Sequence, residues 1–82
     1  MTMPLTMEWT ITTEGKEKRV QEKENTFTLT LQGYQVFPLE QELHVYRYSQ
    51  DEHVGKAQVK ELHWAKGKTT ITYQLISLYS VN

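Results

Sequence analysis

The 82-residue sequence contains no cysteine, only two prolines and four glycines, and no long apolar run. The lack of cysteine excludes disulfides and thiolate metal sites. Since small secreted domains usually depend on disulfides, we expect a cytoplasmic location. No stretch approaches the roughly 20 apolar residues of a membrane-spanning helix, and the first residues do not resemble a signal peptide. We therefore expect no membrane association.

The chain also lacks an excess of charge of one sign. Nine Lys and Arg residues stand against ten Asp and Glu residues, for a net charge of -1. Proteins whose main function is to bind phosphate backbones usually carry a clear positive excess or a basic stripe. The composition therefore argues against strong, purely electrostatic binding of nucleic acids.

Alternation of apolar and polar residues with a period of two runs through most of the chain and predicts β-strands. In residues 26–31, three apolar residues alternate with three threonines. Nearer the N-terminus, Met7, Trp9 and Ile11 share one face of such a run. Within residues 54–64 the apolar phase changes between Val59 and Leu62, which is typical of a β-bulge or a sharp bend.

These patterns predict an all-β fold with little or no helix, as a single β-barrel-like domain over residues 1–82. The expected architecture is a small antiparallel barrel or rolled sheet of five to seven strands, because closing a sheet removes its exposed edges. The last run, residues 69–80, is apolar first on one face and then on the other. We expect it to form a central strand that is covered on both sides or crosses between two halves of a barrel.

The tripeptide Gly67-Lys68-Thr69 matches the end of a phosphate-binding P-loop. The first glycine of that motif is replaced by Leu62, and a strand-forming run follows at the point where a helix should begin. We therefore interpret the tripeptide as a hairpin turn between two strands.

Catalytic and metal-binding patterns are weak. The histidines His44, His53 and His63 lack the close spacing of typical metal ligands, although His44 and His63 can meet across strands. No serine lies in a recognisable nucleophile motif. We expect no catalytic residue, no metal and no cofactor; the remaining enzymatic alternative is a small metal-assisted hydrolase that uses His44, His63, Asp51 and Glu52.

A possible binding surface lies on the segment that contains His44. If Leu43 and Val45 face the core, then His44, Tyr46 and Tyr48 form a row on the other face. Rings beside basic residues resemble the stacking platforms that bind single-stranded nucleic acids. The predicted binding residues are His44, Tyr46, Arg47, Tyr48, Lys56 and Lys60. Alternatively, another strand, the terminal segment or a second copy of the chain covers this row.

The segments LEQELHVYR, GKAQVKEL and GKTTITYQLISLYS resemble an uncharacterised family of short proteins from Bacillus-like bacteria, classed as a domain of unknown function. The resemblance extends from MPLTMEWTITTEGKEKR to SLYSVN, and it implies a bacterial, cytoplasmic β domain without supplying any functional residue. The segment GKAQVKEL and the overall strand order also resemble PUA-like small barrels, several of which bind RNA.

We therefore expect a non-catalytic binding module of the bacterial cytoplasm, with RNA or a nucleotide as a candidate ligand. The alternative is a homodimeric protein–protein interaction domain, in which the aromatic row or an unpaired edge strand forms the interface. The order of the strands stays open, because strands that are apolar on both faces do not fix their register.

Overall fold

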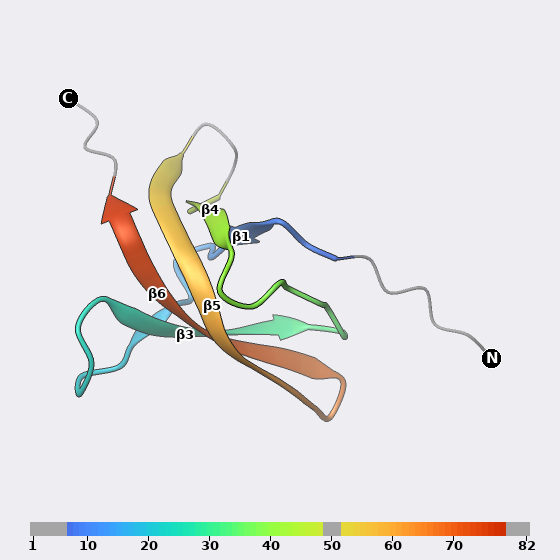
Figure 1. The fold of residues 1–82 in the computed structure, drawn as a ribbon. Coiled ribbons are helices and arrows are strands. Elements are labelled where there is room, and N and C mark those ends of the chain that lie inside the picture. The colour runs from blue at the N-terminus through green and yellow to red at the C-terminus, as the bar shows by residue number, and fades with distance from the viewer. Residues whose placement is uncertain (1–6, 49–51, 79–82) are drawn as a thin grey trace.

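The computed structural model describes residues 7–48 and 52–78 of the 82-residue chain. This part contains six strands and no helix (Figure 1). The strands are β1 (Thr10–Thr12), β2 (Lys18–Arg19), β3 (Thr26–Gln32), β4 (Glu42–Tyr46), β5 (His53–Ala65) and β6 (Lys68–Leu78). The predicted all-β fold with five to seven strands is confirmed.

All six strands form one sheet in the order β1-β4-β5-β6-β3-β2, which is rolled but not closed. Of the two architectures expected from the sequence, the rolled sheet is therefore the one observed. Four of the strand pairs are antiparallel, as expected, but β1 pairs with β4 in parallel. This pairing is possible because the long crossover between the two strands contains β2 and β3, so β1 need not form a hairpin with β4.

The core lies on the concave side of the rolled sheet. The buried apolar residues come from every strand except β2, together with one residue of the segment before β4: Ile11, Leu29, Phe37, Leu43, Val45, Ala57, Val59, Ile71 and Tyr73. Burial of one such aliphatic or aromatic side chain stabilises the fold by about 2 kcal/mol. The period-2 alternation predicted most of this face correctly.

The N-terminal run from Met7 to Ile11 does not follow the predicted alternation. Ile11 is fully buried, but Trp9, which shares its phase, is 56% exposed, and Met7 is also exposed. Strand β1 begins only at Thr10, so the alternation does not extend back to Met7 and Trp9 as a continuous strand.

The hairpin between β5 and β6 forms at the tripeptide that resembles a P-loop. Strand β5 ends at Ala65 and β6 begins at Lys68, so the turn consists of Lys66 and Gly67. Both turn residues have positive φ angles, 55° and 74°, as a two-residue type I′ hairpin requires. The interpretation of this stretch as a hairpin turn is confirmed.

The two long strands are interrupted by register shifts. One shift lies between Val59 and Glu61, which confirms the bulge expected from the change of apolar phase. The other, between Lys56 and Ala57, leaves Ile76 of β6 without a partner in the register and accounts for the switch of apolar face near the end of that strand. Strand β6 is central, as expected, but Ile76 and Leu78 are exposed within the described part of the chain.

Thr69, at the start of β6, connects this strand to the turn that follows β3. Its buried hydroxyl donates to the carbonyl of Gly33 at 2.8 Å and accepts from the amide of Gln35 at 2.8 Å. Nearby, the indole N–H of Trp64 donates to the Gln35 carbonyl at 2.9 Å. The threonine whose hydroxyl would coordinate Mg²⁺ in a P-loop thus holds the segment after β3 in place.

Candidate functional site

Strand β4 places part of the predicted binding row on the outer face of the sheet. Leu43 and Val45 are buried, so His44 and Tyr46 point the other way, as expected. The rings of His44 and Tyr46 lie 6.4 Å apart between centroids, and His53 of β5 joins them at 4.8 Å from each. The Nδ1 atom of His44 and the Nε2 atom of His53 share a hydrogen bond of 3.0 Å.

His53 was not among the predicted binding residues, and a register shift explains the omission. His44 pairs with Lys56, and Val45 with Gly55, but Tyr46 pairs with His53 rather than Val54. The extra residue turns Val54 toward the core and His53 to the outer face, because a shift of one residue exchanges the two faces of a strand. No local sequence signal identifies this bulge.

Arg47 and Tyr48 do not continue the row of rings. The Tyr48 hydroxyl lies 3.0 Å from the position that a Cβ atom on Gly15 would occupy, so this side chain reaches the turn between β1 and β2. Arg47 lines a cavity together with Glu17 and Tyr73. The structure therefore brings together His44 and Tyr46 but places Arg47 and Tyr48 elsewhere.

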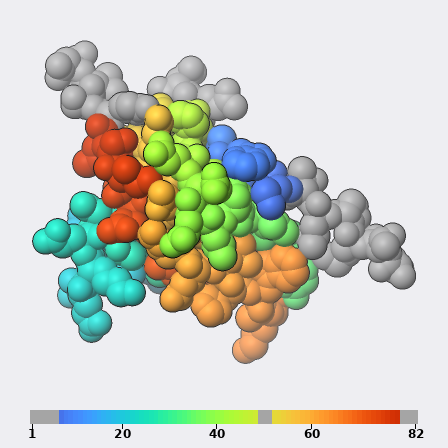
Figure 2. Space-filling model, viewed as in Figure 1, coloured from blue at the N-terminus to red at the C-terminus, as the bar shows by residue number. Residues whose placement is uncertain are grey.

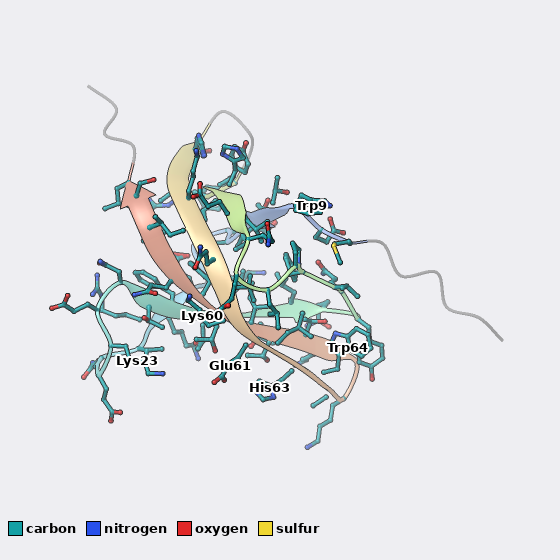
Figure 3. All side chains as sticks on the ribbon, in the orientation of Figure 1. Trp9, Lys23, Lys60, Glu61, His63 and Trp64 are labelled. Carbon is teal, nitrogen blue, oxygen red and sulfur yellow. The ribbon has the colours of Figure 1, made fainter. Side chains whose placement is uncertain are left out.

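The two predicted lysines lie on β5, each beside a glutamate. Lys56 is 3.8 Å from Glu42, and Lys60 is 3.6 Å from Glu40. Figure 2 shows the side chains of β4 and β5 side by side on one face of the molecule, and Figure 3 labels Lys60 on β5. Exposed ion pairs add little stability, but the nearby acids weaken the positive field that a phosphate backbone would meet.

His63 lies further along β5 than His44 and His53, toward the hairpin turn (Figure 3). Its register partner is Thr70, and its Nε2 atom is 3.4 Å from the Glu61 carboxylate. Asp51, another residue of the hydrolase alternative, lies outside the described residues. Within residues 7–48 and 52–78, no group of three or more His, Asp or Glu side chains is arranged to hold a metal ion.

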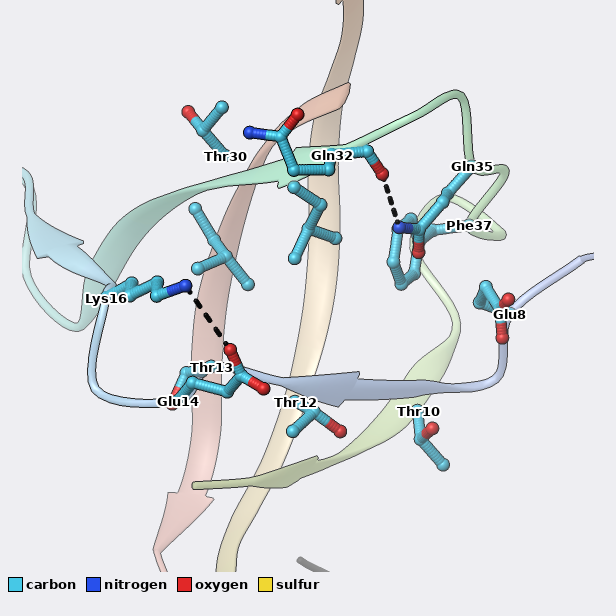
Figure 4. A pocket seen from close by; sticks show the side chains of 12 residues that line it. Glu8, Thr10, Thr12, Thr13, Glu14, Lys16, Thr30, Gln32, Gln35 and Phe37 are labelled. Atoms are coloured by element: carbon cyan, nitrogen blue, oxygen red, sulfur yellow. Dashed lines mark hydrogen bonds and ion pairs between the residues drawn. The ribbon is translucent and has the colours of Figure 1, made fainter. Parts of the chain in front are cut away.

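A gap in the sheet lies between β1 and β3, and we call the cavity in it the window. On the side of β3 away from β6, β2 pairs only with Phe27 and Thr28, so residues 29–32 have no strand partner there in the described chain. No Cα atom of β1 lies within 8 Å of a Cα atom of β3, although both strands are fully described. The window has a volume of about 510 Å³ (Figure 4).

Both ends of the window are closed. At one end, Lys16 and Glu14 form an ion pair of 3.4 Å in the turn after β1. At the other end, the amide of Glu8 donates to the carbonyl of Val36 at 2.7 Å. Figure 4 shows the window between these ends, with β3 on one side and β1 on the other.

The floor and the rim of the window differ in chemistry. Leu29, Leu31 and Phe37 belong to the apolar core or pack against it, whereas most of the remaining lining is polar: Glu8, Thr10, Thr12, Thr13, Glu14, Lys16, Thr30, Gln32 and Gln35. Glu8 is half-buried and has no ion-pair partner among the described residues. The window thus offers an apolar base, polar sides and one carboxylate open to a cation.

The backbone groups of β1 and β3 point into the window at alternate residues. The amide of Thr13 donates to Tyr46 of β4, so by alternation the N–H group of Thr12 points away from β4. On the other side, the carbonyl of Thr26 accepts from Val20 near β2, so Thr30 and Gln32, which share its phase, direct their backbone groups away from β6. Two strand edges that no other described strand pairs therefore face each other; the Gln32 carbonyl on one of them accepts from the Gln35 side-chain amide at 3.2 Å.

A second cavity, of about 260 Å³, lies on the other side of the segment after β1, and we call it the inner pocket. Its lining is largely apolar, with a few charged groups: Thr13, Glu17, Arg19, Asn25, Phe27, Val45, Arg47, Val54, Tyr73, Leu75 and Leu78. Burial, and secondarily the Glu17 carboxylate, raises the pKa of the Tyr73 hydroxyl well above its ordinary value. The Oε1 atom of Glu17 is buried without a hydrogen-bond partner.

Comparison with known proteins gives consistent results. The family model described as "Domain of unknown function (DUF2584)" matches residues 1–82. The uncharacterized protein YtmB of Bacillus subtilis (strain 168) is 45% identical over 82 residues, which is 100% of each chain. The X-ray crystal structure of B. subtilis YtmB has a TM-score of 0.86 at 46% identity and covers 100% of this chain and 99% of its own. The descriptions of these relatives name no activity, substrate or partner.

Proposed function

Because this chain belongs to the family DUF2584, a domain of unknown function, we propose from its geometry that it is a non-catalytic module that binds an extended segment of a protein partner. The observation that carries the proposal is the window, where the unpaired edges of β1 and β3 face each other. Extended peptides commonly bind by adding a strand to an exposed sheet edge. In this chain, one added strand meets two edges.

The separation of the two edges excludes direct pairing and leaves room for an inserted strand. Neighbouring strands lie roughly 4.8 Å apart, so two strands that flank a third are separated by roughly 9.6 Å. The Cα atoms of β1 and β3 are more than 8 Å apart, which is too far for direct pairing. One strand in this space pairs with both edges and completes the sheet as a barrel.

The topology also determines how the inserted strand pairs. Strand β1 runs parallel to β4, and the antiparallel pairs β4–β5, β5–β6 and β6–β3 then make β3 antiparallel to β1. An inserted strand is therefore parallel to one edge and antiparallel to the other. Since β1 has 3 residues, the bound segment is short, about three or four residues, or roughly 10–13 Å of extended chain.

The lining predicts the composition of the bound segment. Alternate side chains of an inserted strand point inward, toward Leu29, Leu31 and Phe37, and these are expected to be apolar. The others point outward, between the threonine and glutamine side chains of the rim. A lysine or arginine near Glu8 would supply the cation that this carboxylate lacks among the described residues.

Nucleic-acid binding is a second candidate, favoured by the cluster of His44, Tyr46 and His53 rings on the outer face. Rings of this kind stack on bases. The glutamates beside Lys56 and Lys60 and the net charge of -1 weigh against it.

A cytoplasmic location and the likeness to PUA-like barrels stay predictions. In the described part of the chain, no helix is long and apolar enough to cross a membrane.

Nuclear magnetic resonance with model ligands tests the proposal. The probe is a capped peptide of alternating valine and threonine with one lysine, added to the labelled protein, and a mixed-sequence single-stranded RNA is the second arm. We expect the peptide to shift the amides of residues 10–12 and 29–32, with a dissociation constant on the order of 100 µM. RNA-induced shifts confined to His44, Tyr46 and His53, with a silent peptide arm, would contradict strand binding and support the second candidate.

A pair of variants at one position sharpens this test. Thr12→Pro removes the backbone N–H group that points into the window, whereas Thr12→Val keeps it and changes only the side chain. We expect peptide binding to weaken about tenfold or more in the proline variant and to change little in the valine variant. Equal binding by both variants would show that the edge of β1 takes no part.

A further inference from the structure

The inner pocket contains an unsatisfied group that strand binding in the window does not explain. The Oε1 atom of Glu17 is excluded from solvent and accepts no hydrogen bond. Buried carboxylate oxygens are costly to leave unpaired, so such an atom in a folded protein calls for a specific explanation. Because Glu17 lines a cavity, a bound molecule with a hydrogen-bond donor can satisfy it.

Two cations line the same cavity without neutralising this acid. Arg19 and Arg47 both contribute to the inner pocket, and the guanidinium of Arg19 lies 5.1 Å from the centre of the Phe27 ring. Among the described residues, neither arginine forms an ion pair within 4.0 Å with Glu17 or with any other acid. Opposite charges thus share one small pocket and remain unpaired.

The rest of the lining is suited to an apolar group. Phe27 and Tyr73 are stacked with their ring centroids 5.7 Å apart, and Val54 and Leu75 pack against the core beside them. The Tyr73 hydroxyl is neutral at neutral pH, and burial and the nearby Glu17 raise its pKa further. The volume, about 260 Å³, limits the occupant to a small molecule.

We propose that the inner pocket binds a small zwitterion with an apolar body, of the class and size of a hydrophobic α-amino acid. Its ammonium group donates to the Glu17 carboxylate, its carboxylate accepts from Arg47, and its side chain lies against Phe27, Val54 and Leu75. Glu17 and Arg47 then gain the partners they lack among the described residues, while Arg19 stays over the Phe27 ring, and charge-assisted hydrogen bonds of this kind are the strong ones.

The proposal is independent of strand binding, because it rests on different groups. Thr13 is the one residue that lines both cavities. A chain that binds the zwitterion but no peptide would refute the proposed function and leave this inference intact, and the reverse result would refute only the inference.

The test uses L-leucine and two analogues that each keep one charge: 4-methylpentanoate, which lacks the ammonium group, and 3-methylbutylamine, which lacks the carboxylate. Each is titrated into the labelled full chain by nuclear magnetic resonance. We expect leucine to shift the amides of Phe27, Tyr73 and Leu75, with a dissociation constant on the order of 1 mM or tighter. Both analogues should bind at least about tenfold more weakly, because each loses one charge-assisted contact, with Glu17 or with Arg47.

Variants complete the test. Glu17→Gln keeps the shape of the side chain but removes its charge, and we expect it to weaken leucine binding about tenfold or more. Glu61→Gln, on the exposed part of β5, is the matched control and should bind leucine as the unmodified chain does. Arg47→Met serves as a second variant, whose loss of binding checks the carboxylate contact if Glu17→Gln is poorly folded.

Three results would overturn the inference. The first is the absence of saturable shifts with leucine up to about 10 mM. The second is equal binding of leucine and either single-charge analogue. The third is unchanged leucine binding in a folded Glu17→Gln or Arg47→Met variant.

Discussion

The window and the inner pocket lie on either side of the segment after β1, and they are incomplete in opposite ways. At the window, strand edges are unpaired and the charged pair Lys16–Glu14 is satisfied, with Glu8 the one lining charge that lacks an ionic partner among the described residues. At the inner pocket, the strands around Tyr73 are paired on both sides, but Glu17, Arg19 and Arg47 lack ionic partners among the described residues. An unpaired backbone edge recognises another backbone, whereas unpaired side-chain charges recognise a small charged molecule.

The difference also concerns stability. Part of the wall of the inner pocket belongs to the hydrophobic core or packs against it, as does the floor of the window. The rim of the window consists largely of exposed side chains on short edges, where substitutions away from the core usually change stability by less than about 0.5 kcal/mol. We therefore expect the wall of the inner pocket and the rim of the window to respond very differently to mutation.

The largest expected effect is at the wall of the inner pocket. Tyr73→Ala removes a ring that is 2% exposed and stacked on Phe27, and it should destabilise the protein by about 3–5 kcal/mol. Thr10→Ala, on the rim of the window, is the control and should cost less than about 0.5 kcal/mol. Chemical denaturation measures both; similar losses for the two variants would contradict the distinction between the cavities.

A smaller effect is expected at the segment that closes one end of the window. Thr69→Val preserves the shape of the side chain but leaves the Gly33 carbonyl and the Gln35 amide without their buried partner. The expected loss is about 1–3 kcal/mol, accompanied by faster hydrogen exchange at Gln35. Thr70→Val, which removes only the exposed hydroxyl pair with Thr30, should cost less. An unchanged Gln35 exchange rate would show that Thr69 does not hold this segment.

Replacement of Glu17 should stabilise the protein, in contrast to the two destabilising variants above. Because its buried Oε1 atom has no partner, Glu17→Leu should stabilise the protein by about 1 kcal/mol while abolishing leucine binding. Glu61→Leu, at an exposed position, should change stability by less than about 0.5 kcal/mol. Destabilisation by Glu17→Leu in thermal unfolding would mean that the acid is satisfied in solution and would remove the main support for the zwitterion site.

The last prediction concerns the pH dependence of stability at Tyr73, which should appear only in alkaline solution. Burial raises the pKa of its hydroxyl above the ordinary value of 10.0, so the folded state keeps this proton to a higher pH than the unfolded state does. This contribution to stability is fully present below pH 10 and is lost as the pH rises through the folded pKa. Denaturation at a series of pH values should show a steeper alkaline loss for the unmodified chain than for Tyr73→Phe; parallel curves would contradict the assignment.

The features that follow local rules were predictable from the sequence. Alternation identified Leu43 and Val45 as core residues, and the turn at Lys66 and Gly67 follows from residues that tolerate positive φ. The bulge near Lys60 was visible as a change of apolar phase. Each of these signals lies within a few residues of the feature that it predicts.

The two cavities and the presence of His53 in the ring cluster were not predictable, because they depend on non-local pairing. The window exists because β1 pairs in parallel with β4, an arrangement that no nearby residue encodes. The inner pocket joins Glu17, Arg47 and Tyr73, which are distant in the sequence. His53 reaches the ring cluster only through a register shift, which no nearby residue signals.

Amide hydrogen exchange of the free protein, followed by the same measurement with the valine–threonine–lysine peptide, tests the window most directly. We expect Thr12 and Thr30, whose N–H groups point into the window, to exchange at least about 100-fold faster than Ile11 and Leu29, which pair with β4 and β6. The peptide should slow exchange at Thr12 and Thr30 and leave exchange at Ile11 and Leu29 unchanged. If these two amides are already as protected as Ile11 and Leu29 in the free protein, the sheet is closed in solution and the proposed strand site does not exist.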